Sequence, residues 1–183
     1  EVLGEKINVQ EFQKLVDEYS EVIKMQQGQE NLNDEQLNRV KDMVWNSFVQ
    51  NKIIAKEAQK LGLTVTDQEI ANILAEGTNP MLMQTPFVNQ QTGRFDVNAL
   101  KKFLADYKTQ QNANPQLAKQ YDTIYKYWTF IEKNLRQQLL AQKYQSLFAH
   151  CLISNKIEAK MAFNDQNQES QIQLASLPYS SIN

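Results

Sequence analysis

The chain has one histidine and one cysteine, and these two residues are neighbours, His150 and Cys151. Adjacent residues on a helix point about 100° apart, so neither side chain can easily take the other's proton. A single cysteine excludes an intramolecular disulfide, and this pair is too small a set for a four-ligand zinc site. We interpret Cys151 as a small apolar residue packed near the end of a helix.

Carboxylates are plentiful, but their spacing is not that of an acid–base pair. Asp106, Asp122 and Glu132 are most simply read as parts of solvated helix faces. The sequence contains neither a glycine-rich phosphate loop nor a nucleophile elbow. It therefore predicts no catalytic residue, no metal site and no small-molecule cofactor in this chain.

The composition predicts a single soluble domain over residues 1–183 that is mostly helical. Five glycines and four prolines are few for a β-rich domain, and the net charge of −2, with lysines and arginines spread along the chain, argues against a nucleic-acid partner. No apolar run approaches the roughly 20 residues of a membrane span. The chain starts at Glu1 without a methionine, so we expect a processed or excised piece, to which an upstream segment could supply a membrane tether.

Apolar residues at three- and four-residue steps predict a series of capped helices. The expected helix starts are Asn8 with Glu11, Asn33 or Asp34, Thr66 with Glu69, and Asp96. Gly28 and Gly62 are expected to end the first two helices. The apolar face of the second helix is so broad that we expect it to be buried on several sides.

The longest predicted helix runs from about residue 117 to 148, with Trp128 in its apolar stripe. At 1.5 Å per residue it spans roughly 45 Å, so it should act as a strut or as one wall of a groove. A further helix is expected to begin at Ser154 or Asn155.

Weakly alternating segments at the two ends of the chain, residues 2–7 and 171–177, predict short strands. A lone strand leaves its backbone groups unpaired, so we expect the two to pair and close the domain. Pairing across two copies, in a homodimer, is an alternative. The predicted fold is therefore mainly α, with one long spine helix and a small two-stranded pairing of the N- and C-terminal strands.

Three segments carry a family pattern. Residues 44–70 read as a long helix ending in A-x-x-L-G, then a short apolar turn and V-T-D-x-E-I. Residues 4–19, GEKINVQEFQKLVDEY, read as a short strand and a capped helix, and residues 92–104 contain G-x-F-D before a helix ending in F-L. Together they resemble the N-terminal chaperone region of SurA/PpiD-type periplasmic peptidyl-prolyl isomerases, over nearly the whole chain.

The resemblance implies a helical module that holds unfolded or extended polypeptide clients in the periplasm. In such proteins this module is joined to parvulin-type isomerase domains, and nothing in this chain looks like one. We therefore expect non-enzymatic binding here and isomerase activity elsewhere in the full-length protein. The leading alternative is a structural or oligomerisation domain with a fixed protein partner, and an isomerase acting in this fragment ranks third.

Two apolar sets are candidates for client contact. The first lies in the stretch without helical periodicity, residues 78–94, where adaptable methionines suit promiscuous binding. The second is aromatic and lies on the longest helix, where Tyr127 and Phe130 point away from the face that Trp128 shares; one aromatic set should be core and the other could line a groove. For the loop set the alternative, which we favour, is that these residues plug the core. The predicted client-binding residues are Met81, Leu82, Met83, Phe87, Tyr121 and Tyr125.

Overall fold

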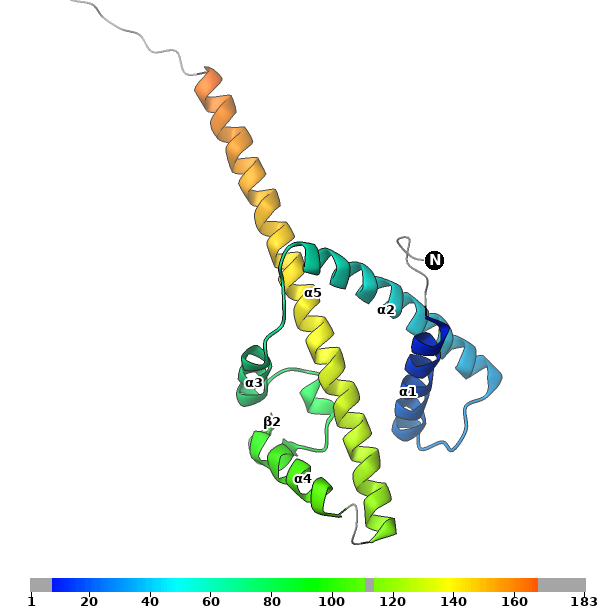
Figure 1. Cartoon of the computed structure of the whole chain (residues 1–183). Coiled ribbons are helices and arrows are strands. Elements are labelled where there is room, and N and C mark those ends of the chain that lie inside the picture. The colour runs from blue at the N-terminus through cyan, green and yellow to red at the C-terminus, as the bar shows by residue number, and fades with distance from the viewer. Residues whose placement is uncertain (1–7, 111–113, 168–183) are drawn as a thin grey trace, which may run out of the picture. The chain divides into compact units, whose positions relative to one another are not determined.

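The computed structural model describes residues 8–110 and 114–167 (Figure 1). The chain divides into two compact units, residues 1–144 and 145–183. The described elements are α1 (Val9–Gln27), α2 (Asp34–Lys60), α3 (Asp67–Glu76), the short 3₁₀ helix η1 (Leu82–Gln84), β1 (Val88–Asn89), β2 (Arg94–Phe95), α4 (Val97–Gln110) and α5 (Pro115–Asn167). Within this part of the chain, none of the helices combines the length and apolarity needed to cross a membrane.

Side-chain caps fix where the first three helices begin. Asn8 caps α1 by accepting a hydrogen bond from the backbone N–H of Gln10, and Asn33, rather than Asp34, caps α2 in a full capping box with Gln36. Thr66 caps α3 through the backbone N–H of Glu69. These caps confirm the predicted helix starts to within a residue.

The long spine helix is confirmed as α5, but its predicted end is wrong. The helix continues without a break through Ser154 and Asn155, where a new helix was expected to start. Residues 145–167 contain neither glycine nor proline. Serine and asparagine alone cost a helix interior only about 0.5 kcal/mol each, so they can cap a helix but do not have to end one.

The described two-stranded sheet is a small antiparallel hairpin, in which Val88 pairs with Phe95 and Asn89 with Arg94. Gly93, in the turn that joins them, has a positive φ of 65°. This hairpin was not predicted, because two-residue strands are too short to show alternation. The predicted strands at residues 2–7 and 171–177 lie outside the described residues.

Buried apolar side chains form two clusters in the first unit. The main core joins α3, η1, the hairpin and α4 to α5, and includes Trp128, whose predicted burial is confirmed at 4% exposure. Its buried members are Val22, Ile70, Leu82, Phe87, Phe95, Leu100, Phe103, Tyr127, Trp128, Ile131 and Leu135. The second cluster, which we call the α1–α2 core, lies between α1 and α2 and consists of Val16, Val40 and Val44.

Helix α2 is less buried than its broad apolar face predicts. Val44 and Phe48 face inward, but Met43, Trp45 and Ile53 are exposed. Of the described elements, α1 makes the most extensive contact with α2, and the exposed side chains leave part of the apolar face of α2 uncovered. The expectation that α2 is buried on several sides is therefore wrong for the described part of the chain.

Candidate functional site

The predicted loop candidates divide into buried and half-buried residues. Leu82, in η1, is completely buried, and Phe87 is 7% exposed. The Phe87 ring packs edge-on against Phe95 and Trp128, with ring centroids 6.2 and 6.1 Å away. Leu82 and Phe87 thus occupy the main core, as the core-plug alternative describes. Met81 and Met83 are only half-buried.

The aromatic candidates on α5 are half-buried and stacked against α4. The Tyr121 ring lies parallel to Phe103 with centroids 5.3 Å apart, and the Tyr125 ring lies parallel to Tyr107 at 4.3 Å. Offset stacking of this kind stabilises the packing of two helices. The stacked faces of Tyr121 and Tyr125 are therefore occupied by another part of the same chain.

An open groove of about 1090 Å³ runs between α1 and α5. Its apolar lining comes from Val22 and Met25 of α1 and from Tyr127 and Phe130 of α5. Val22 and Tyr127 are almost fully buried and form the floor, whereas Met25, 42% exposed, lies nearer the surface. The Tyr127 hydroxyl donates a hydrogen bond of 3.0 Å to the carbonyl oxygen of Gln84, which fixes that ring in the floor.

The rim of the groove carries charge of both signs. Five lysines and five carboxylates line it, namely Lys14, Lys24, Lys119, Lys126, Lys133, Asp17, Glu18, Glu21, Glu30 and Asp122. Lys126 lies 2.9 Å from Asp122, and its hydrogen bond to that carboxylate lowers the pKa of Asp122 and raises the pKa of Lys126. With equal numbers of opposite charges, the rim offers no net electrostatic preference to a charged ligand.

A smaller pocket of about 210 Å³ lies beside the groove, between α1, α2 and α5. We call it the inner pocket. Leu15, Val44 and Phe48 supply its apolar wall. Glu18, Phe130 and Lys133 line both the groove and the pocket, so these residues stand where the two cavities meet. The Lys133 ammonium and the Glu18 carboxylate form an ion pair of 3.5 Å there.

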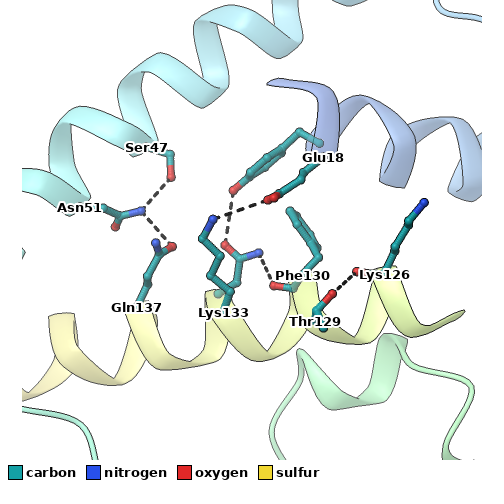
Figure 2. A network of polar contacts seen from close by, with 10 residues as sticks. Glu18, Ser47, Asn51, Lys126, Thr129, Phe130, Lys133 and Gln137 are labelled. Carbon is teal, nitrogen blue, oxygen red and sulfur yellow. Dashed lines mark hydrogen bonds and ion pairs between the residues drawn. The ribbon is translucent and has the colours of Figure 1, made fainter. Parts of the chain in front are cut away.

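Uncharged polar side chains line the inner pocket and connect α1 and α2 to α5 (Figure 2). Asn51 donates hydrogen bonds from Nδ2 to Gln137 Oε1 at 3.0 Å and to Ser47 Oγ at 3.4 Å. The Tyr19 hydroxyl donates to Asn134 Oδ1 at 3.5 Å. We call the set Tyr19, Ser47, Asn51, Asn134 and Gln137 the amide seam.

The sequence did not identify the groove residues as a set. Tyr127 and Phe130 were recognised as lying off the face that Trp128 shares, which was the available signal. Val22 and Met25 gave none, because the partner of α1 is a helix about 100 residues further along the chain. In the described residues no three histidine, cysteine or acidic side chains come together as a metal site would require. The chemistry that this region offers is apolar contact and hydrogen bonding.

Comparison with known proteins identifies a family for this chain. No curated protein and no solved structure shows significant similarity to the chain. The model of one family, described as the SurA-like N-terminal domain, matches residues 1–104. The match spans more than half of the chain and includes α1, α2, α3 and the hairpin up to α4. The chain therefore belongs to the SurA-like N-terminal domain family.

Proposed function

We propose that this chain is the chaperone module of a periplasmic foldase and that it holds unfolded polypeptide in the groove between α1 and α5. Membership of the SurA-like N-terminal domain family supports a chaperone-like role. In this proposal the peptidyl-prolyl isomerase activity belongs to other parts of the full-length protein, and a segment outside this chain supplies any tether to the inner membrane.

The observation that carries the proposal is the groove itself. Its lining on α1 and the C-cap of that helix extends from Lys14 to Gly28, which at 1.5 Å per residue is a length of about 21 Å. An extended polypeptide rises about 3.3 Å per residue, so about six client residues fit along it. Small-molecule pockets are typically 300–1,000 Å³ and enclose most of their ligand. An open groove of about 1090 Å³ suits a chain that passes through it.

In this proposal the groove binds a client with modest affinity, and neither binding nor release requires an energy source. The more accessible apolar residues of the lining, Met25 and Phe130, contribute hydrophobic contact, and the mixed rim stays solvated and avoids selecting clients by charge. Met25 adds a flexible thioether side chain that adapts to different client side chains. These properties match the needs of a module that must bind many unfolded sequences and release them.

Exchange of one exposed methionine tests the proposal, and a second methionine serves as its matched control. Met25 lines the groove, whereas Met43, on α2, lines neither cavity, and the two are similarly exposed, at 42% and 46%. Met25→Ser and Met43→Ser should both melt within a few degrees of the parent, because surface substitutions usually change stability by only about 0.5 kcal/mol. Light scattering from chemically denatured citrate synthase, diluted in the presence of each variant, measures client protection.

We expect Met25→Ser to protect the client less well and Met43→Ser to protect it as the parent does. Equal protection by all three proteins would remove the groove from the proposal. Loss of protection in Met43→Ser alone would place client binding on α2.

A second candidate function, a structural or oligomerisation domain, rests on the exposed apolar residues Met43, Trp45 and Ile53 of α2. A fixed partner seated there would cover them. Static light scattering of the purified chain, alone and with the unfolded client, separates the two functions. A constant dimer that ignores the client favours this second candidate, and a monomer that gains mass only with the client favours the chaperone.

A further inference from the structure

We propose that the amide seam recognises the main chain of an extended client, so that binding depends on the client's peptide groups rather than on its side chains. This inference rests on the proposed chaperone function and names the chemical feature of the client that the site reads. The seam lines the inner pocket, next to the groove that would hold the client.

The chemistry of the seam matches that of a peptide backbone. A side-chain amide carries the same donor and acceptor groups as a peptide bond. The hydrogen bond from Asn51 Nδ2 to Gln137 Oε1, at 3.0 Å, joins two such amides across α2 and α5. A client peptide group inserted between them can accept from Asn51 and donate to Gln137. One internal hydrogen bond is thereby exchanged for two, and no buried polar group is left without a partner.

The seam is accessible enough for this exchange. Ser47, Asn51, Asn134 and Gln137 are all half-buried rather than enclosed. The inner pocket beside them provides about 210 Å³ of space. Between pocket and groove stands the Lys133–Glu18 ion pair, whose side chains are 47% and 34% exposed. An ion pair so exposed to solvent contributes little and opens easily.

The described β-strands do not offer a peptide backbone an alternative binding edge. Unpaired strand edges are the usual partners of an extended chain. The described strands β1 and β2 are each two residues long and pair with one another, which leaves too short an edge for stable addition of a strand. Side-chain amides on the helices therefore provide the backbone-matching donors and acceptors.

Methylation of the client's backbone nitrogens tests the inference directly, because it removes donors while leaving every side chain in place. The probe is a fluorescein-labelled synthetic peptide of alternating alanine, serine and valine with a lysine at each end, long enough to span the groove. A second version carries an N-methyl group on every other residue. Fluorescence anisotropy gives the Kd of each peptide for the parent chain and for Gln137→Met, which replaces the seam amide by an apolar side chain of similar length.

Gln138→Met is the matched control, because Gln138 is exposed and lines neither cavity. In the parent and in Gln138→Met, N-methylation should weaken binding about tenfold, the effect of about one lost hydrogen bond. In Gln137→Met the penalty should fall to about twofold or less. Comparing the two peptides within each protein cancels any effect of N-methylation on the free peptide. Gln137→Leu, which also removes the acceptor of the client N–H, provides a second variant should Gln137→Met fail to fold.

The outcomes separate this inference from the proposed function. If the parent binds neither peptide and does not protect the citrate synthase client, both proposals fail. If the parent binds both peptides with the same Kd, or if the N-methyl penalty is unchanged in Gln137→Met and in Gln137→Leu, backbone recognition by the seam is wrong. In those last two cases the groove's role in holding clients stands.

Discussion

Gly77, at the end of α3, lies so close to the backbone of the β-hairpin that a residue with a Cβ atom would clash there. It ends α3 with a φ of 67°, in the left-handed region that glycine adopts without strain. The backbone N–H of Phe95 donates a 3.0 Å hydrogen bond to the Gly77 carbonyl oxygen. A Cβ at residue 77 would lie 2.7 Å from the carbonyl oxygen of Phe95. Both conformation and space therefore require glycine here.

Gly77→Ala should destabilise the domain far more than Gly28→Ala does. Gly28 has a nearly identical φ of 64°, but nothing lies within 4 Å of its would-be Cβ. Both variants incur the left-handed penalty of about 1–2 kcal/mol. Gly77→Ala adds a backbone clash that typically costs a further 1–3 kcal/mol. Urea denaturation of both variants measures the difference, and equal losses would show that the hairpin shifts freely away from α3.

The aromatic residues of α5 illustrate why the site residues were only partly predictable from the sequence. Helical spacing placed Tyr121 and Tyr125 on one side of α5 and Tyr127 and Phe130 elsewhere. It could not tell which side α4 covers, because that depends on where the chain returns after residue 110. In the structure α4 stacks on Tyr121 and Tyr125, and Tyr127 and Phe130 line the groove. Local pattern gives the faces of a helix, and tertiary packing assigns them.

At the scale of elements, the sequence predicted the helix starts and the ends of α1 and α2 near Gly28 and Gly62, but not the end of α5. Starts depend on side chains close in sequence, such as the reciprocal hydrogen bonds of Asn33 and Gln36 at α2. The end of α5 had no such signal, because Ser154 and Asn155 cap a helix only when the backbone before them is not already helical. The hairpin around Gly93 depends on contacts with the main core, which no local pattern reveals.

An ion pair links α3 to α5 at one of these predicted caps. Glu69, in the first turn of α3, lies 2.5 Å from the Lys143 ammonium, which also donates to the Thr64 carbonyl oxygen at 2.8 Å. The hydrogen bond from Lys143 lowers the pKa of Glu69, and a further hydrogen bond from Thr66 acts in the same direction. The carboxylate is thus held ionised at the point where α3 meets the spine helix.

This arrangement predicts a specific loss of stability in acid. Because the folded-state pKa of Glu69 lies below its unfolded value, its contribution is complete above about pH 4.5 and disappears as the pH falls through the folded-state pKa. Lys143→Met removes the main cause of the lowered pKa. Urea denaturation at pH 7 and at pH 3 should show a smaller acid-induced loss of unfolding free energy in Lys143→Met than in the parent. An identical loss in both would mean that the pair is not formed in solution.

At the scale of the first unit, two apolar cores meet across a largely polar surface. The α1–α2 core holds α1 to α2, and the main core holds α3, the β-hairpin and α4 to α5. Between them lie the amide seam, the Lys133–Glu18 pair, the edge-on contact of Tyr19 with Phe130, and Val22 reaching into the main core. Polar interfaces of this kind permit relative motion more readily than apolar ones. A groove with one wall on each side of such an interface can adjust its width.

This organisation predicts that α1 and α2 open locally while the main core stays folded, which is the behaviour of partly independent cooperative units. Val44 is 1% exposed in the α1–α2 core, and Leu135 is 1% exposed in the main core. Val44→Ala should cost about 2 kcal/mol and should lower amide protection about thirtyfold in α1 and α2 only. Leu135→Ala should lower amide protection in α4 and in the part of α5 that belongs to the first unit. In α1 and α2 it should lower protection only at amides that exchange through global unfolding. Hydrogen exchange followed by mass spectrometry resolves these segments. If Val44→Ala lowers protection equally in α4, the two cores unfold as one, and the width of the groove is fixed by the same cooperative structure that holds the main core together.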